Sequence, residues 1–413
     1  MLKKYRLGEL IDVTRGMSLP GENYSNKGNL IRLTMGNFNY SGGGFKENTS
    51  KTDIYYTGEV RDEYILNKGD IITPLTEQAI GLLGTTAMIP ESGKYVQSQD
   101  VALVKCREDK IDHLFCYYLV SSDIVRKQLS AAAQQTKIRH TSPDKIMDCV
   151  VWIPELDLQR KIGKVLYEID QKISLNTRMN AELEAMAKQL YDYWFVQFDF
   201  PDENGKPYKS SGGKMVYNEK LKREIPEGWE VKNIFEVVDV LYGYPFSTDL
   251  FTNNETEKPV VRIRDILDNT TSAYTTEDVD EVYKLKEGDL VIGMDGNFHV
   301  NYWHNNLCYL NQRCVRFRDK KDVPISSIQL YYDIKPVIDN KQKRIQGSTV
   351  GHLLDSDIKE FWVLCPLKNK KEYKDAFDSI LFKMTTNKIQ NQKLTHLRDS
   401  LLPMLMNGQV TIV

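Results

Sequence analysis

The chain contains one long pattern twice. The segment 66–72 (LNKGDII) recurs 219 residues later as 285–291 (LKEGDLV). Two further matches follow in the same order, at offsets of 212 and 211: His140, Ile146, Val151 and Pro154 with His352, Ile358, Val363 and Pro366, and then Asn176, Asn180, Leu183 and Leu190 with Asn387, Asn391, Leu394 and Leu401. Three matches with a slowly drifting offset indicate a duplicated unit about half the chain long. A repeat of this length indicates two domains rather than a solenoid.

Each half is predicted to contain the same series of elements. β-branched residues between turn residues favour strands, and these are followed by a helical stretch and then by a long helix. The predicted elements are strands at 29–33 and 259–264, helical stretches at about 114–129 and 328–338, and long helices at about 154–195 and 370–406. The Gly-Asp pair inside each copy of the first match predicts a turn that leads into an apolar strand.

The resulting boundaries define two α/β domains, two long helices and a linker. They are 1–153 for the first domain, 154–198 for the first long helix, 199–228 for the linker, 229–367 for the second domain and 368–413 for the second long helix. The linker is predicted because 199–214 is rich in Gly, Pro, Ser and charge.

Both long helices carry a heptad seam. The first seam consists of Ile162, Leu166, Ile169, Ile173, Asn176, Asn180, Leu183, Ala187, Leu190 and Trp194, and the second of Phe377, Ile380, Met384, Asn387, Asn391, Leu394, Arg398 and Leu401. Two amphipathic helices, each packed on its own domain, would also fit this spacing. The matched asparagines favour pairing of the helices with each other, because a seam amide seeks a partner in the opposing helix and fixes register. A duplicated unit that pairs with its copy predicts antiparallel helices, with Asn176 opposite Asn391 and Asn180 opposite Asn387.

Bulk properties restrict the class of protein only loosely. The chain has 55 Lys and Arg against 57 Asp and Glu, a formal net charge of −2, so no overall basic character marks a nucleic-acid binder. The N-terminal residues do not form a secretory signal and no apolar run would span a membrane, which predicts a cytoplasmic protein. Six scattered cysteines predict buried, reduced thiols, and the spacing of His304, Cys308 and Cys314 fits no usual zinc pattern.

Three segments resemble the specificity subunits of type I restriction-modification systems. They are 153–162 (IPELDLQRKI), where a proline and a glutamine precede the helix, 190–200 (LYDYWFVQFDF), and the loop 136–143 (TKIRHTSP). The resemblance covers essentially the whole chain, although 401–408 lacks the Tyr-Trp-Phe ending of the central segment. It implies an α+β fold in which two pseudo-twofold-related α/β target-recognition domains are separated by an antiparallel pair of long conserved-region helices, a coiled coil.

The resemblance also implies a division of labour between subunits. Each target-recognition domain would read one half of a split, asymmetric site in double-stranded DNA. The helices would bind two modification subunits, which carry S-adenosylmethionine and methylate adenine, and restriction subunits, where present, would use ATP and Mg²⁺. The chain itself would hold no cofactor and no metal.

The sequence lacks the motifs of the partner enzymes. It has no [N/D]-P-P-[Y/F] loop and no Walker A motif, and Gly212-Gly213-Lys214 is followed by Met215. A non-specific DNA- or protein-binding scaffold on the same duplicated frame is the alternative function. A cryptic nuclease at Glu108-x-Lys110 or Glu230-x-Lys232 is less favoured, because such triplets are common by chance.

Candidate DNA-binding residues lie in loops at equivalent places of the two repeats. Side chains of Arg, Lys, Asn, Gln, Ser and Thr read base edges, and Lys and Arg also hold phosphates. In the first half the candidates are Thr76, Glu77, Gln78, Lys137, Arg139 and His140. In the second half they are Asp295, Asn297, Gln346, Ser348, Thr349 and His352, with Lys343 and Arg344 as phosphate contacts.

Overall fold

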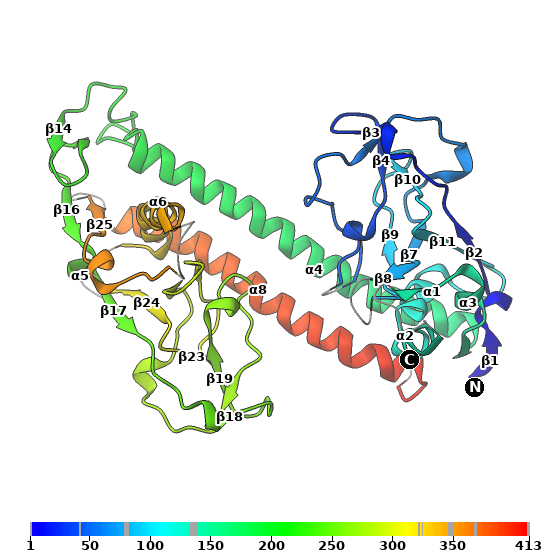
Figure 1. The fold of residues 1–413 in the computed structure, drawn as a ribbon. Coiled ribbons are helices and arrows are strands. Elements are labelled where there is room, and N and C mark those ends of the chain that lie inside the picture. The colour runs from blue at the N-terminus through cyan, green and yellow to red at the C-terminus, as the bar shows by residue number, and fades with distance from the viewer. Residues whose placement is uncertain are drawn as a thin grey trace. The chain divides into compact units, whose positions relative to one another are not determined.

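The fold is that of a computed structural model, which describes residues 2–40, 43–77, 82–132, 139–320, 323, 325–345, 351–366 and 370–410. The chain divides into two compact units, of which the first comprises Met1–Ile173 with Lys393–Val413 and the second Ser174–Gln392. Each long helix contributes to both units, because α4 spans Leu156–Tyr191 and α8 spans Lys370–Met406 (Figure 1).

The first unit is built on an antiparallel sheet with the strand order β2-β11-β7-β9. Its strands are β2 (Ile11–Arg15), β11 (Val101–Cys106), β7 (Ile71–Pro74) and β9 (Ala87–Met88). A second sheet has the order β3-β5-β4-β10-β6, formed by β3 (Tyr24–Ser25), β5 (Tyr55–Tyr56), β4 (Leu30–Arg32), β10 (Tyr95–Val96) and β6 (Ile65–Leu66). The first unit also contains the β1 (Lys3–Arg6) and β13 (Val150–Ile153) pair and the helices α1 (His113–Val120), α2 (Asp123–Ala132) and α3 (Pro143–Met147).

The second unit repeats this topology. Its main sheet has the order β17-β24-β21-β22, formed by β17 (Val238–Tyr242), β24 (Cys314–Asp319), β21 (Leu290–Gly293) and β22 (Val300–Tyr302). The smaller sheet contains β18 (Phe251–Thr252), β20 (Tyr274–Thr275), β19 (Lys258–Val261) and β23 (Tyr309–Leu310), and β16 (Glu230–Asn233) pairs with β25 (Trp362–Cys365). Its helices are α5 (Ile234–Val237), α6 (Ser327–Ile345) and α7 (Asp355–Ile358). The shared strand order confirms the duplication predicted from the sequence.

The Gly-Asp turn has the same geometry in both units. Gly69 and Gly288 adopt φ of 91° and 86°, a left-handed backbone conformation that favours glycine. The carboxylates of Asp70 and Asp289 each accept a hydrogen bond from the backbone amide three residues earlier, at 2.8 and 2.6 Å. This turn starts β7 in one unit and β21 in the other, so it sets the position of the loop that follows each strand.

Each unit buries one end of each long helix in its core. In the first unit, Ile162 and Leu166 of α4 and Leu405 of α8 pack among residues of the main sheet and α1. In the second unit, Ala187 of α4 and Phe377 of α8 pack with the apolar faces of the main sheet and α6. Some seam residues of both helices therefore pack in the cores of the units, and others contact the opposing helix.

A buried glutamine explains the start of α4. The side chain of Gln159, 1% exposed, accepts a hydrogen bond from the backbone amide of Asp112 at 3.0 Å and donates one to the carbonyl of Pro154 at 2.9 Å. The carboxylate of Asp112 in turn caps α1 by accepting from the amide of Phe115 at 2.9 Å. Pro154, just before α4, and Gln159, in its first turn, thus tie the helix to the rest of the first unit.

The segment predicted as a linker, 199–228, is only partly an exposed loop. Residues 201–214 are mostly exposed, as their composition suggests, but β14 (Met215–Asn218) and β15 (Arg223–Pro226) form a hairpin. The ring of Phe200 stacks on Trp229, with centroids 4.9 Å apart, and lies 6.0 Å from the ring of Tyr373 on α8. The packing of Phe200 against Trp229 and Tyr373 therefore holds this segment in the core of the second unit, which the local Gly and Pro content could not indicate.

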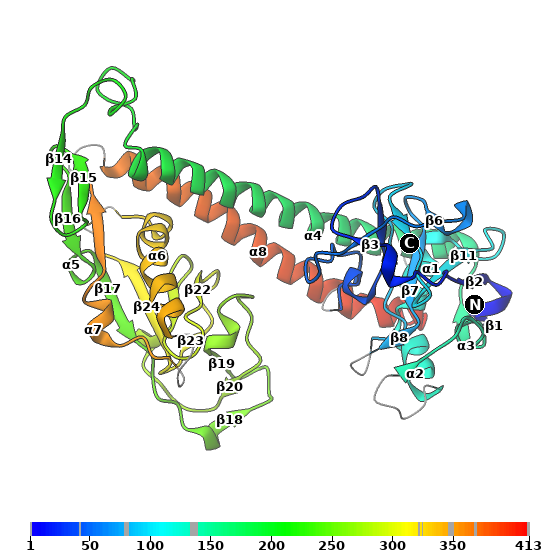
Figure 2. The same ribbon diagram turned by 45° about the horizontal axis from the view of Figure 1, so that its top comes forward.

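Within the second unit the two long helices run antiparallel (Figure 2), and the four asparagines form a polar layer between them. Asn176, fully buried, donates to the Oδ1 of Asn391 at 2.8 Å and to the Oε1 of Gln390 at 2.8 Å. Asn387 donates to the Oδ1 of Asn180 at 2.9 Å, and Asn180 donates to the carbonyl of Met384 at 3.0 Å. These are the opposed pairs that the heptad register predicts. That the pairs determine the register stays a prediction.

We expect replacement of all four asparagines by Leu to retain or raise helix stability while it loosens the register. The Oδ1 of Asn176 has no hydrogen-bond partner among the described residues, and a buried unsatisfied polar atom costs about 1–3 kcal/mol. Thermal unfolding would measure the stability. Cysteine pairs placed in register and one heptad out of register would report the alignment by disulfide trapping.

The matched control for this variant is Met179→Leu, because Met179 lies on the exposed face of α4. The control should change neither the unfolding temperature nor the trapping pattern. A marked loss of stability in the four-asparagine variant, with trapping still confined to the in-register pair, would contradict the role proposed for the amides.

Candidate nucleic-acid interface

The two loops predicted to read DNA in each repeat come together in the structure. In the first unit β8 (Thr76–Glu77) pairs antiparallel with β12 (Arg139–His140), and His140 lies opposite Thr76. In the second unit Asp295 forms an isolated antiparallel bridge with His352. The register places Asp295 at the position of Thr76 and His352 at that of His140, so the two units present equivalent loop pairs.

In the second unit these loops carry a cluster of ionisable side chains. The Nδ1 of His352 lies 2.7 Å from one carboxylate oxygen of Asp295, and Arg313 approaches the other at 3.0 Å. The side chains of His352 and Arg313 are 54% and 61% exposed, whereas that of Asp295 is 21% exposed. Together with Tyr242, Gln312 and Leu354, they line an open cleft of about 350 Å³.

Tyr242 forms a fixed wall of this cleft. Its hydroxyl donates a hydrogen bond to the carboxylate of Asp355, the first residue of α7. Burial, followed by this hydrogen bond, raises the pKa of Tyr242 above its ordinary value. The phenol therefore keeps its proton at neutral pH. We assign the ring to the structure of the cleft rather than to acid–base chemistry.

Arg313 was not among the residues predicted from the sequence. Strand β11 and strand β24 correspond at an offset of 213, which places Arg313 at the position of Asp100. The backbone contacts agree: the carbonyl of Asp100 accepts from the amide of Leu75 at 2.8 Å, and the carbonyl of Arg313 from the amide of Met294 at 2.9 Å. A residue-by-residue extension of the repeat through these strands would have found this position.

The predicted loop residue Asn297 and the basic residues of α6 lie on connected segments. Gln342 of α6 accepts from the amide of Phe298 at 2.8 Å and donates to the carbonyl of Gly296 at 3.1 Å. The loop that carries Asn297 is thereby attached to the last turns of α6. The side chains of Asn297, Lys343 and Arg344 are exposed.

Glu77 departs from its predicted role. Its side chain is 1% exposed, and one carboxylate oxygen accepts hydrogen bonds from the amides of Leu82 and Leu83 at 2.7 and 2.9 Å. A buried carboxylate held in this way positions the loop that follows it and does not face solvent. In the same strand pair Thr76 is half-buried and His140 exposed, so these two keep the exposure that a DNA contact requires.

Several predicted residues lie outside the described part of the chain. They are Gln78, Lys137, Gln346, Ser348 and Thr349, together with the side chain of Arg139, whose backbone belongs to β12. Their DNA contacts stay predictions.

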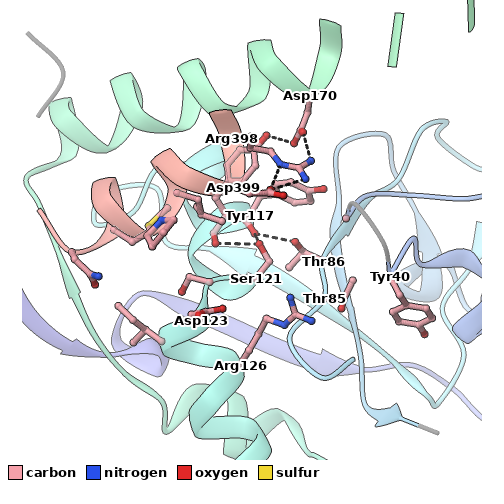
Figure 3. A pocket seen from close by; sticks show the side chains of 18 residues that line it. Tyr40, Thr85, Thr86, Tyr117, Ser121, Asp123, Arg126, Asp170, Arg398 and Asp399 are labelled. Carbon is pink, nitrogen blue, oxygen red and sulfur yellow. Dashed lines mark hydrogen bonds and ion pairs between the residues drawn. The ribbon is translucent and has the colours of Figure 1, made fainter. Parts of the chain in front are cut away.

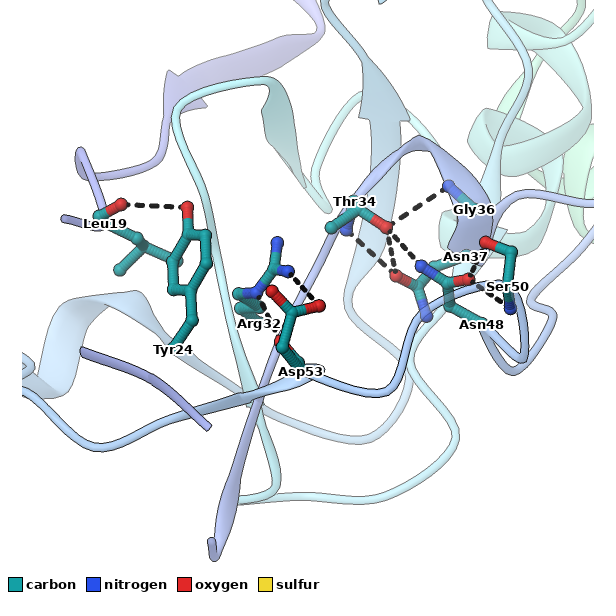
Figure 4. Close-up of polar contacts among 9 residues, drawn as sticks. All are labelled: Leu19, Tyr24, Arg32, Thr34, Gly36, Asn37, Asn48, Ser50 and Asp53. Carbon is teal, nitrogen blue, oxygen red and sulfur yellow. Dashed lines mark hydrogen bonds and ion pairs between the residues drawn. The ribbon is translucent and has the colours of Figure 1, made fainter. Parts of the chain in front are cut away.

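A polar network in the first unit shapes a neighbouring loop (Figure 4). The guanidinium of Arg32, 6% exposed on its side chain, pairs with the carboxylate of Asp53 at 3.2 Å and stacks 3.8 Å from the ring centre of Tyr24. The hydroxyl of Thr34 accepts hydrogen bonds from the backbone amide of Gly36 at 3.2 Å and from the side-chain amide of Asn48 at 2.9 Å. These polar contacts join residues 32–36 to residues 48–53.

The first unit has a cavity of about 320 Å³ where α1 and α2 meet the ends of the long helices (Figure 3). Arg398 of α8 pairs with Asp170 of α4 at 2.7 Å, and the hydroxyl of Tyr118 donates to the other oxygen of Asp170 at 2.6 Å. Burial raises the pKa of Tyr118, so the phenol remains a donor. The described lining residues include no His or Cys, and we assign this cluster to anchoring α8 on the first unit.

Within the described residues, no group of three or more His, Cys, Asp and Glu side chains lies close enough to hold a metal ion. His304, Cys308 and Cys314 are buried, and burial lowers the pKa of His304 and raises that of Cys308 to about 12. Among the helices that the structure describes, none has an apolar stretch of the length that a membrane span needs.

Comparison with protein families gives a match over most of the chain. Residues 2–185 and 226–397 match the model described as the type I restriction modification DNA specificity domain. The two matched segments correspond to the two copies of the repeat.

Individual relatives are distant but cover much of the chain. The MjaIX specificity subunit of Methanocaldococcus jannaschii is 22% identical over 74% of this chain and 71% of its own length. The HindI specificity subunit of Haemophilus influenzae is 23% identical over 65% and 70%, and the EcoBI specificity subunit of Escherichia coli 24% identical over 45% and 40%. The crystal structure of a type I restriction-modification S subunit from M. genitalium superposes with a TM-score of 0.60 at 15% identity, over 98% of this chain and 96% of that one, which shows a shared fold.

We expect Asn297→Ala and Lys343→Ala to affect DNA binding in different ways. If Asn297 reads a base, its loss should cost about 1–3 kcal/mol at one position of one half-site. Loss of a phosphate contact at Lys343 should weaken binding to all sequences alike and lower the slope of log affinity against log salt by about one. Titrations on specific and scrambled duplexes at several salt concentrations, with the modification subunit present, would separate the two effects.

The expectation for Asn297 extends to Gln78, Arg139 and Thr349. Unchanged half-site preferences in all four alanine variants would show that the reading loops are assigned wrongly.

Proposed function

Because this chain belongs to the type I restriction modification DNA specificity family, we propose that each of its units reads one half of a split, asymmetric DNA site. The observation that carries the proposal is the equivalent loop pair in both units, with different side chains in corresponding places. Thr76, Asp100 and His140 in the first unit correspond to Asp295, Arg313 and His352 in the second. Two readers of the same shape with different chemistry would recognise different half-sites.

The long helices are proposed to bind the subunits that carry out the chemistry. An exposed apolar stripe runs along the part of α4 in the second unit and just past the end of this helix at Tyr191. Its residues, at a spacing of four, seven and seven, are Leu175, Met179, Met186 and Tyr193, which are 42%, 41%, 54% and 37% exposed. Phe382 of α8 is 65% exposed. Helical stripes of this kind fit an apolar partner helix. The proposed partners are two modification subunits that use S-adenosylmethionine and, where present, restriction subunits that use ATP and Mg²⁺, in the cytoplasm.

The chain is proposed to contribute specificity without catalysis. We expect the purified chain alone to show no methyltransferase, nuclease or ATPase activity, and the chain together with modification subunits to direct adenine methylation to a bipartite motif. Methylation sequencing of a host genome with and without the gene for this chain would test the second expectation. Turnover by the rigorously purified chain would overturn the first.

Two other functions lead to different results in these experiments. A non-specific scaffold would bind specific and scrambled duplexes with equal affinity, and its deletion would leave no methylated motif missing. A nuclease at Glu230 and Lys232 is disfavoured, because the two side chains pair with each other at 3.1 Å.

The helix length is proposed to set the gap between the half-sites. A seam of about 28 residues at about 1.5 Å per residue spans about 42 Å, which equals about 12 base pairs. Insertion of one heptad at equivalent positions of α4 and α8 should lengthen the non-specific gap of the methylated motif and leave both half-sites unchanged. A matched pair of conservative substitutions on the exposed faces, without insertion, is the control, and an unchanged gap after insertion would refute the proposal.

A further inference from the structure

Arg313 combines three features, and no other described Lys or Arg of the second unit lines the same cleft. It is 61% exposed, it lines the cleft beside the bridged reading loops, and its guanidinium is held by a carboxylate that is itself mostly covered. The ion pair to Asp295 uses the Nη1 of Arg313 at 3.0 Å. The carboxylate therefore orients one edge of the guanidinium.

The arginines of β24, the strand that follows Arg313, form ion pairs with other carboxylates. The side chain of Arg316 is 1% exposed and pairs with Asp239, and Arg318 pairs with the buried Asp289. Lys343 and Arg344 lie exposed at the end of α6, with no carboxylate paired to them among the described residues. Exposed cations without such a partner suit phosphate contacts, whereas a guanidinium oriented by a carboxylate suits a directed contact.

We propose that Arg313 reads a guanine in the half-site of the second unit and that Asp295 is its positioning residue. This inference rests on the proposed function. Guanine presents two acceptors, O6 and N7, in the major groove, and arginine satisfies both with two parallel N–H groups. A guanidinium fixed before binding loses less rotational freedom when the contact forms, so the discrimination gained from the contact is larger.

The first unit has the opposite charge at this position. Asp100, the equivalent of Arg313, is a carboxylate that only accepts hydrogen bonds, and its repeat neighbour Thr76 carries no charge in place of Asp295. A carboxylate repels the acceptors of guanine and accepts from the amino group of cytosine or adenine. The inference therefore assigns guanine to one half-site and a base with an amino group to the corresponding position of the other.

The experiment measures base preference position by position. The chain, assembled with its modification subunits, would methylate a library of duplexes in which both half-sites are randomised, and sequencing of methylated molecules would give the preference at each position. In R313A we expect preference for guanine to fall about 10- to 100-fold at one position of one half-site, with the other half-site unchanged. R313K should retain part of the preference, and D295N should reduce it less than R313A does.

Two controls separate a reading role from a structural one. Arg6 forms an exposed pair with Asp148 in the first unit, at 3.5 Å, so R6A removes the same kind of side chain from the other unit and should change no base preference. D100N should alter the corresponding position of the first half-site alone. Equal unfolding temperatures for R313A and the unsubstituted chain would show that the loss is not one of folding.

The outcomes are distinguishable. If the unsubstituted complex selects a motif and R313A lowers methylation of all sequences equally, Arg313 is a phosphate contact and the assignment is overturned. It is also overturned if R313A leaves every preference unchanged. If the unsubstituted complex shows no base preference at all, the proposed function fails and this inference fails with it.

Discussion

The polar layer between the long helices lies within the second unit, and it is the interaction on which we propose that the alignment of the helices there depends. Asn176 donates a hydrogen bond to Asn391 at 2.8 Å, and Asn387 donates one to Asn180 at 2.9 Å. The side chain of Asn176 is fully buried. An amide in such a place is satisfied in one alignment only, because a shift by one turn would leave it facing apolar side chains. Since both helices also enter the core of the second unit, this alignment would govern where that core finds its apolar partners on them.

The two units share a sheet framework but differ in the loops that it carries. Their main sheets share one strand order, and the same Gly-Asp turn starts the strand before each bridged loop pair. The loops themselves differ in charge, with Asp100 where the other unit has Arg313. A rigid scaffold with variable loops lets recognition change without a change of core packing, since the exposed side chains contribute little to stability.

The long helices were predicted well, because the spacing of apolar and polar residues along a helix can be seen in the sequence itself. Heptad spacing and matched asparagines predicted both long helices and their opposed pairs, and α8 begins and ends at the predicted residues, Lys370 and Met406. The segment 199–228 was predicted less well, because its order comes from Phe200 packing against Trp229 and Tyr373, residues near to and far from it in the chain. Glu77 was read as a surface residue, because a turn that buries its carboxylate against two backbone amides leaves no mark in composition.

The sequence by itself determined that the chain is a duplication, which elements each half contains and how the long helices are aligned, because these follow from periodicity and from repetition. Tertiary structure alone decided which charged side chains share a cleft. Asp295, Arg313 and His352 come from three segments separated by 18 and 39 residues, and they meet because β24 lies between β17 and β21 and because a backbone bridge joins Asp295 to His352. Strand order in a sheet is set by packing over long sequence distances, and no local pattern of residues encodes it.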